Sequence, residues 1–367
     1  MIHKPLLNSD WSDIVTRLGG AAALETSARQ TGAFKRQRQV ECAVDLLRLI
    51  FAYSLNGLGL RLTAAWAESV GIAQLSNVAL LRRLDKTAPW LEHLIGQVLL
   101  TNIESYPVAA HGRPIRIMDA TVVSKAGKKA KTTNGVWRVH AAFDLPAERF
   151  SAFDLTDEHE AETIDRLEVV PGEIRLADRA YLQTDRLVSV LEAGADILIR
   201  AGWRAAAWQD KKGKPVDLIA TLKAAAHQGF IDRPIFLARK NGPPLALRLV
   251  ALALPPEEAN AARQAAIATA KRKQKSLNDG TLIAAEWVIL VTSLSTKSFS
   301  AHDIGNLYRL RWRIEIAFKR LKSLIGLKRP PGQDAALAKV FVLAHLMICL
   351  LAEPLAAKFG VSPLRPR

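Results

Sequence analysis

The chain has 367 residues, and 49% of them are apolar, which is enough for two or three folded domains. Lysine and arginine number 51 against 35 aspartate and glutamate residues, so the formal net charge is +16. Such a charge repels itself unless an anionic partner neutralises it, which favours nucleic acid over the competing membrane surface. Only Cys42 and Cys349 are present, without a CxxC or histidine pattern, which argues against a disulfide framework or a zinc finger. We therefore expect a cytoplasmic protein.

No membrane-spanning or secreted segment is predicted. The first twenty residues contain no apolar stretch before a small-residue cleavage site. The longest apolar run, 340–352, includes His345 and is too short to cross a bilayer as a helix. We expect it to lie in a buried C-terminal helix within residues 336–367.

Residues 1–110 are predicted to form an all-helical DNA-binding domain. Within them one helix breaks at Gly71 and a new helix starts after Ser76, a typical N-cap residue. This outline resembles a helix-turn-helix, although two packed helices of a plain bundle are an alternative. The second helix would present three polar side chains outward, Asn77, Arg82 and Arg83.

Short strands replace helices after Pro114. Strands are predicted at 115–118, 138–144, 150–155, 173–177 and 196–200, with helices at 157–167 and 181–193. This order is typical of a ribonuclease-H-like α/β sheet, in which the first and fourth strands lie side by side. Asp119 and Asp178 follow those two strands. A single aspartate often caps the turn after a strand, but two at matched strand ends indicate a site.

The predicted catalytic core is interrupted. It comprises residues 111–200 and 301–335, and a β-rich insertion occupies 201–300. Strands are expected in the insertion at 230–237, 245–254 and 287–294, with an alanine-rich basic helix or linker at 257–280.

A helix is predicted from Tyr308 to Lys322. At about 100° per residue, Tyr308, Arg311, Glu315 and Lys322 share one polar face, opposite an apolar stripe. A surface helix with internal ion pairs is the simple alternative.

Asp119, Asp178 and Glu315 form a group of carboxylates with a specific chemistry. Gathered carboxylates repel one another unless hard cations compensate them, and oxygen ligands suit Mg²⁺ or Mn²⁺. Two such ions about 4 Å apart activate an attacking oxygen and stabilise a leaving oxygen in phosphoryl transfer. This chemistry would let a basic protein cut or join a nucleic acid backbone.

The same residues resemble a known family. Tyr308, Arg311, Glu315 and Lys322 fit the pattern Y-x2-R-x3-E-x6-K, the signature of DDE transposases of the insertion sequence 4 family. The stretches IRIMDATVVS and IRLADRAYL, which contain the two aspartates, are similar to that family's first and second catalytic blocks. The similarity covers residues 45–352, and the family also has a β-rich insertion before its glutamate.

The resemblance implies a transposase that binds terminal inverted repeats, cleaves the element ends and joins their 3′-hydroxyls to target DNA. Asp119, Asp178 and Glu315 would be the catalytic residues and would hold two Mg²⁺ or Mn²⁺ ions. The predicted DNA-binding residues are Tyr308, Arg311, Lys322, Trp312, Lys319, Arg82 and Arg83. The partners would be double-stranded DNA and, at paired ends, a second copy of the chain in a homodimer.

Some residues have more than one interpretation. In relatives that form a hairpin, aromatic residues hold a flipped base; Trp203, Trp208, Trp287 and Trp312 would qualify, with core packing as the alternative. The stretch HEAE, 159–162, lacks the HExxH pattern, so capping and solvated acids explain it, while a place near the site for His159 or Glu162 stays open. Basic clusters at 35–38, 128–131, 211–214 and 271–275 either follow DNA phosphates or are solvated loops.

Two rival functions remain. One is a catalytically silent relative that only occupies DNA. The other is a metal-dependent nuclease without strand transfer.

Overall fold

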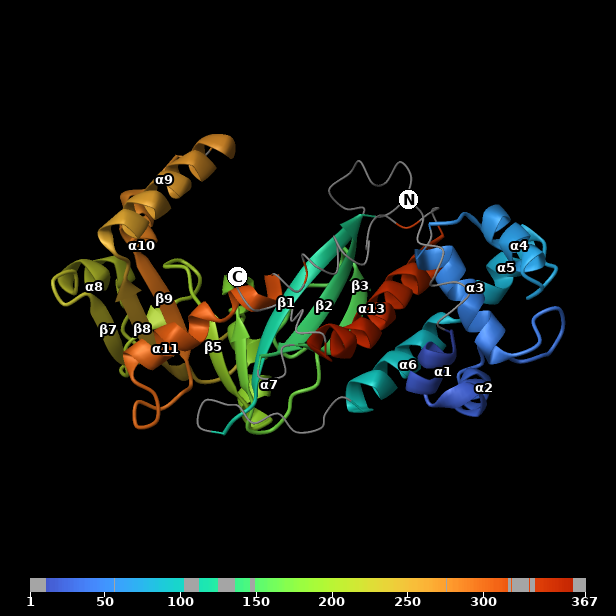
Figure 1. Cartoon of the computed structure of the whole chain (residues 1–367). Helices are drawn as coiled ribbons and strands as arrows, with labels where there is room; N and C mark the ends of the chain where they lie inside the picture. The colour runs from blue at the N-terminus through green and yellow to red at the C-terminus, as the bar shows by residue number, and fades with distance from the viewer. Residues whose placement is uncertain are drawn as a thin grey trace.

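The structure of the protein is a computed structural model. It describes residues 11–55, 57–101, 112–124, 136–145, 149–274, 276–315, 318, 330 and 334–358. Helices gather at one end of the molecule, and a sheet runs from the centre to the other end (Figure 1). A continuous apolar core extends from the helical end onto one face of the sheet.

The helical end is built from the first six helices of the described residues and the last one among them. They are α1 (Trp11–Arg17), α2 (Gly20–Gln30), α3 (Ala43–Leu55), α4 (Leu60–Ser69), α5 (Asn77–Leu84), α6 (Ala88–Thr101) and α13 (Ala335–Lys358). Most residues of α3 are buried, so α3 is a central helix of this region. Helix α13 packs against α3 and α6, which brings the two ends of the described chain together.

Helix α13 is a core helix. Among the described residues it alone is long and apolar enough to cross a membrane, but 72% of residues 335–352 are buried inside the fold. The expected buried C-terminal helix is present. It extends beyond the apolar run 340–352 at both ends, from Ala335 to Lys358.

The helix-turn-helix outline matches the structure in its element order. Helix α4 ends at Ser69, and Gly71 has a φ of 71°, a left-handed conformation that glycine adopts without steric cost. The Ser76 hydroxyl accepts a hydrogen bond from the Ala79 backbone N–H at 3.1 Å, so Ser76 caps α5 as expected.

The rest of the described chain is built around one nine-stranded mixed sheet. Its strands are β1 (Ile115–Ser124), β2 (Val136–Asp144), β3 (Arg149–Asp157), β4 (Ile174–Ala177), β5 (Asp196–Arg200), β6 (Trp208–Gln209), β7 (Phe230–Leu237), β8 (Leu245–Ala253) and β9 (Trp287–Thr292). Their order in space is β3-β2-β1-β4-β5-β9-β8-β7-β6. The β1–β4 and β4–β5 pairs are parallel, and the other pairs are antiparallel. The prediction that the first and fourth strands are neighbours is therefore confirmed.

The strands between positions 201 and 300 extend the same sheet. Strand β9 pairs with β5, so β8, β7 and β6 continue the hydrogen-bonded order beyond it. Helices α8 (Leu218–Ala224), α9 (Pro256–Arg272) and α10 (Asp279–Ala285) accompany these strands, and α9 projects from the sheet region in Figure 1.

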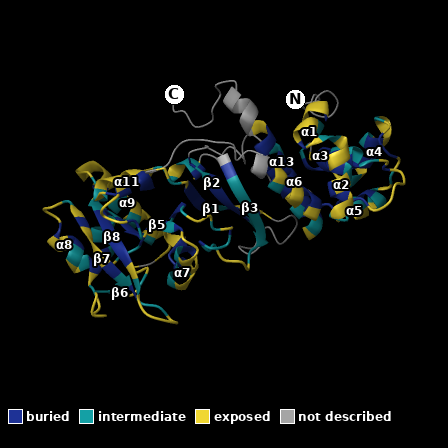
Figure 2. Cartoon of the chain, turned by 90° about the horizontal axis from the view of Figure 1, so that it is seen from below, coloured by how far each residue is buried: buried dark blue, intermediate teal, exposed yellow. Residues whose placement is uncertain are grey.

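Apolar side chains cover both faces of the sheet because neighbouring strand residues point to opposite sides. Ile117 and Leu176 lie in the core shared with α13 and with α11 (Ala301–Arg309). Met118 and Ala177 belong to a second core with α7 (Thr184–Glu192) and α8. Figure 2 shows the resulting buried centre of the sheet. The next residues along β1 and β4 leave these cores and become available to a site.

The predicted helix over 157–167 is wrong. Strand β3 continues to Asp157, and the chain then runs through turns to β4 without a helix. The Asp157 carboxylate accepts from the His159 backbone N–H, so it caps the turn that follows β3, and no helix continues from that turn. The buried Arg175 guanidinium donates to the backbone carbonyls of Ile164 and Leu167, which fixes this segment as a loop.

Two other helices differ from their predictions. The helix expected at 181–193 is split into a short 3₁₀ turn, Arg179–Tyr181, and α7. The helix expected to begin at Tyr308 instead begins at Ala301, because Ser300 and Asp303 form a capping box.

The prediction of one regular α-helix through Tyr308 and Arg311 is also wrong. Helix α11 ends at Arg309, and residues 312–315 form a new helical segment. Between them, backbone N–H groups bond three residues back, as in Arg311 to Tyr308 and Ile314 to Arg311. This tighter 3₁₀ winding aligns residues at i and i+3, so Tyr308 and Arg311 still share a side.

Candidate functional site

The two predicted aspartates lie at neighbouring positions, one on β1 and one directly after β4. Met118 pairs with Ala177 in the parallel register, Asp119 is the next residue of β1, and Asp178 follows the last residue of β4. Strand β1 does not end at Asp119 as predicted but continues to Ser124. From Asp119 onward it is paired with β2, whereas its pairing with β4 ends at Met118. The two carboxylates therefore lie where β4 ends and β1 loses one partner strand.

Asp119 is held in a mostly buried position. One carboxylate oxygen, Oδ1, accepts from the Ala120 backbone N–H at 2.8 Å, and Oδ2 lies 3.6 Å from Nη1 of Arg311. Burial raises the pKa of Asp119 to about 6, against the lowering effect of these two contacts. The negative charges of Asp178 and Glu162 raise that pKa further. Burial and the neighbouring carboxylates therefore outweigh the lowering effect of Arg311 on this pKa.

Asp178 is fixed by the turn that comes after it. Its Oδ1 accepts from the Ala180 backbone N–H at 2.7 Å, so Asp178 caps the 3₁₀ turn Arg179–Tyr181. The aspartate is therefore both a cap and a member of the acidic group, and the two interpretations of the sequence do not exclude each other.

Arg311 connects the third predicted carboxylate to the first. Its Nη2 lies 2.5 Å from Oε1 of Glu315, while Nη1 faces Asp119. The Glu315 side chain is 58% exposed, whereas that of Arg311 is 18% exposed. The structure thus brings Asp119, Asp178 and Glu315 to one area, with the Arg311 guanidinium between Asp119 and Glu315.

The arrangement does not form a closed metal cage. Within the described part of the chain, no three histidine, cysteine, aspartate or glutamate side chains gather closely enough to hold a metal ion. The oxygen donors of Asp119 and Asp178 nevertheless suit a hard cation, and the raised pKa of Asp119 shows that added positive charge would stabilise its ionised form.

Tyr308 is a buried residue next to Arg311. It is 9% exposed, and the Arg311 guanidinium carbon lies 6.0 Å from its ring centre. Burial raises the pKa of Tyr308, while the nearby Arg311 and Arg200 lower it. Trp312 is 45% exposed. Lys319 and Lys322 lie outside the described residues.

Two residues near the aspartates were not among the predicted site residues. Burial raises the pKa of Glu162, and Asp178 raises it further, while Arg138 lowers it from a distance of 3.3 Å. Burial also raises the pKa of Tyr181, and the charges of Asp119, Glu162 and Asp178 add to this shift. A signal existed for Glu162, which the HEAE stretch contains, but the loop that brings it back to the strands could not be read from the sequence.

The tryptophans divide into core and surface residues. Trp208 and Trp287 are buried in the core beside α8, and the Trp208 Nε1–H donates to the Trp203 carbonyl at 2.9 Å. Core packing therefore explains Trp208 and Trp287, and Trp312 is the exposed member of the group.

Arg82 and Arg83 lie far from the aspartates, on α5 at the helical end. Arg82 is exposed, as expected. Arg83 is only partly exposed, and its guanidinium carbon lies 5.6 Å from the ring centre of the buried Phe34. Of the basic clusters, 35–38 lies close to Arg83, 211–214 is an exposed turn, 271–274 ends α9, and 128–131 falls outside the described residues.

Comparison with known proteins finds a family and several relatives that each match most of the chain. The family described as "Transposase DDE domain" matches residues 110–351. The transposase for insertion sequence element IS421 of Escherichia coli is 35% identical over 352 residues, which cover 94% of each chain. The InsL protein for insertion sequence element IS186A of Escherichia coli (strain K12) is 35% identical over 351 residues, again 94% of each chain.

The large mixed sheet with aspartates on adjacent parallel strands fits a ribonuclease-H-like catalytic domain. The family match covers this sheet and its carboxylates. The chain belongs to the DDE transposases of insertion sequences and is a transposase enzyme, as its motifs predicted. Membership implies the use of a divalent metal ion and action on DNA.

Proposed function

We propose that this transposase binds the terminal inverted repeats of its element, cleaves the ends and transfers the strands to target DNA by two-metal phosphoryl transfer. The observation that carries the proposal is the adjacent placement of Asp119 and Asp178, joined through Arg311 to Glu315. The net charge of +16 supports a polyanionic substrate.

Asp119, Asp178 and Glu315 are the proposed ligands of two Mg²⁺ or Mn²⁺ ions. A bound divalent cation would supply a Lewis acid that activates the attacking oxygen and stabilises the leaving oxygen. Glu315 and Arg311 belong to one helical turn, so a shift of the Arg311 guanidinium from Asp119 towards a DNA phosphate would open the acidic group.

The basic and aromatic residues around Glu315 are proposed to hold DNA. The Arg311 guanidinium can bind a phosphate through two parallel hydrogen bonds, and Lys322 and Lys319 would act as point charges. Tyr308 packs beside Arg311 and would fix its position. The exposed Trp312 offers a face on which a base can stack.

We further propose a homodimer at paired element ends, acting in the cytoplasm on nucleoid DNA. Two ends must be cut and joined together, which requires two active sites in one complex. Residues 1–110, which contain Arg82 and Arg83, would form the DNA-binding domain beside the catalytic core of 111–200 and 301–335, with 201–300 as its insertion and 336–367 as the C-terminal helix.

The direct test is cleavage of a labelled duplex that carries the element's own end, in the presence of Mg²⁺. We expect end-specific nicking and joining by the wild type. Asp119→Asn and Glu315→Gln should each abolish both reactions while DNA binding survives, since each variant keeps the shape of the side chain. Glu258→Gln, which neutralises an exposed carboxylate on α9, is the matched control and should remain active.

The same experiment separates the rival functions. Binding without cleavage by the wild type would favour a silent DNA-binding relative. Cleavage without joining would favour a nuclease. Cleavage that persists in both carboxylate variants would place the metal site elsewhere.

A further inference from the structure

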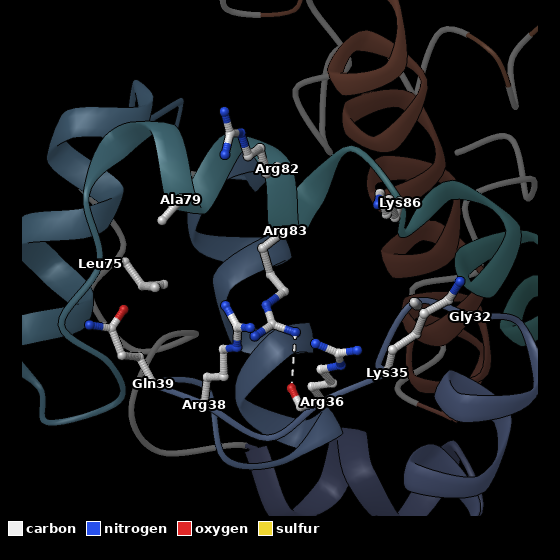
Figure 3. A pocket seen from close by; sticks show the side chains of 11 residues that line it. Gly32, Lys35, Arg36, Arg38, Gln39, Leu75, Ala79, Arg82, Arg83 and Lys86 are labelled. Carbon is white, nitrogen blue, oxygen red and sulfur yellow. Dashed lines mark hydrogen bonds between the residues drawn. The ribbon is translucent and has the colours of Figure 1, made fainter.

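A concentrated group of positive charges lies at the helical end of the molecule, away from the carboxylates on the sheet (Figure 1). A cleft of about 460 Å³ is lined by residues of the α2–α3 loop and of α5 with its flanking turns. Its basic side chains are Lys35, Arg36, Arg38, Arg82, Arg83 and Lys86. We call this the basic cleft (Figure 3). It joins the cluster at 35–38 to the arginines of α5, which the sequence had placed in separate segments.

The positive charge of the basic cleft is not neutralised within the described structure. None of its described lining residues is an aspartate or a glutamate, and none of its six basic side chains forms an ion pair with a described carboxylate. Other arginines of the same region do, since Arg29 pairs with Glu25 at 2.6 Å and Arg48 lies 3.9 Å from Asp45. The basic cleft therefore differs from the ordinary surface of this region.

Arg83 shows that the cations are held close together. Figure 3 shows Arg83 extending from α5 towards Arg36 and Arg38. The Arg83 Nη1–H donates to the Arg36 carbonyl at 3.4 Å, and its guanidinium stacks near Phe34. Burial lowers the pKa of Arg83, and the positive charge of Arg38 lowers it further. An anion in the basic cleft would relieve this repulsion.

The shape of the group favours a phosphate backbone over base edges. Arg83 is turned against the loop and is half-buried, so it cannot extend fully into a DNA groove. Arg36, Arg38, Lys35 and Lys86 are exposed and can each contact a phosphate from outside the duplex. Contacts of this kind fix the position of a protein on DNA without reading its sequence.

We propose that the basic cleft binds consecutive phosphates of a double-stranded DNA backbone, independently of base sequence and of divalent metal. This inference rests on the proposed function, because it takes DNA as the partner. It assigns the 35–38 loop and α5 a joint role as a backbone clamp, in place of base reading by α5 alone.

The test is DNA binding by the full chain in EDTA, measured by fluorescence anisotropy over a series of KCl concentrations. The probes are a duplex with the element's own end and a shuffled duplex of equal composition. The variants are Arg36→Gln/Arg38→Gln and Arg82→Gln/Lys86→Gln, one from each side of the basic cleft, and both leave the Arg83 contact with Phe34 in place. The matched control is Lys240→Gln/Lys297→Gln, which removes two exposed charges from the sheet region.

We expect each cleft variant to bind both duplexes about tenfold more weakly and to lower the slope of log affinity against log salt by about 1 to 2 units, since fewer counterions are released. The control should change neither quantity by a comparable amount. Thermal unfolding of each variant would verify that the helical end is folded.

Three results would overturn the inference: unchanged binding in both cleft variants, an equal loss in the control, or a loss confined to the element's own end. The test is independent of catalysis, because EDTA removes the metal. If the carboxylate variants lose cleavage but still bind DNA, the inference is unaffected. If the cleft variants cleave and bind DNA as the wild type does, the inference is wrong while the proposed function stands.

Discussion

The carboxylate site and the basic cleft differ in whether their charges are neutralised by neighbouring side chains. At the site, Arg311 lies between Asp119 and Glu315, so an internal cation already compensates part of the negative charge. The basic cleft is lined by six basic side chains, and no described carboxylate lines the space. A group that is compensated internally must exchange its partner before it can bind something new, whereas an uncompensated group binds its counterion directly. The carboxylate site is therefore expected to bind metal or DNA only after Arg311 has moved away from its carboxylate partners. The basic cleft is expected to bind DNA without such a rearrangement.

Removal of Arg311 is expected to have the largest effect. Arg311→Gln takes away the charge shared by Asp119 and Glu315 and also the proposed phosphate contact. We expect the cleavage rate to fall by about 100- to 1,000-fold, as on loss of one transition-state donor. Single-turnover cleavage of the labelled end duplex would measure it, with Arg309→Gln, an exposed neighbour, as the control.

The Arg311→Gln variant also tests whether Arg311 competes with a metal ion for the carboxylates. If Arg311 holds the acidic group closed, Arg311→Gln should bind Mn²⁺ in the absence of DNA more tightly than the wild type does, as followed by calorimetry. Weaker Mn²⁺ binding would mean that Arg311 supports the ligands instead of competing with the cation.

A second prediction concerns pH and a histidine near the site. His140 on β2 is buried, its Nε2 lies 2.8 Å from the Thr156 hydroxyl oxygen, and burial together with Arg166 and Arg138 lowers its pKa to about 4. The unfolded chain has the higher histidine pKa, so it binds more protons than the folded chain between pH 6.5 and 4. The free energy of unfolding should therefore decrease as the pH falls through this window.

The expected contribution of His140 to the loss of stability at pH 4.5 is roughly 2 to 3 kcal/mol. Urea unfolding of the wild type and of His140→Gln at pH 7 and pH 4.5 would isolate it, because glutamine keeps a polar contact with Thr156 and does not titrate. Equal losses of stability in the two proteins would assign the acid sensitivity to other groups.

The aspartate pair could be predicted from the sequence because it depends on local signals. An apolar strand before each aspartate and the order of elements between them were enough to place Asp119 beside Asp178. The residue types and spacing of Tyr308, Arg311 and Glu315 were enough to indicate that they lie near one another, although the helix that carries them breaks after Arg309 and Tyr308 is buried in the core instead of lying on a polar face.

The parts that were not predicted depend on contacts distant in sequence. The 157–167 segment reads as a helix until the buried Arg175 binds its carbonyls, and Glu162 reaches the site only through the loop that forms there instead. Arg83 reads as an outward residue of α5 until Phe34, 49 positions earlier (83 − 34), provides a surface for it. Periodicity reports which face of an element is apolar, but not which distant loop covers a polar side chain.

The smallest predicted effect lies in the cap of α5. The Ser76 hydroxyl accepts from the Ala79 N–H, so Ser76→Ala should lower the free energy of unfolding by about 1 kcal/mol. Since α5 carries Arg82 and Arg83, fraying of its first turn should weaken DNA binding in EDTA only slightly, and less than either cleft variant does. Ser295→Ala, at a turn in the sheet region, should leave DNA binding unchanged. If Ser76→Ala instead weakened binding as much as Arg36→Gln/Arg38→Gln, the start of α5 would itself contact DNA, and the contrast between a backbone clamp and a base-reading helix would be lost.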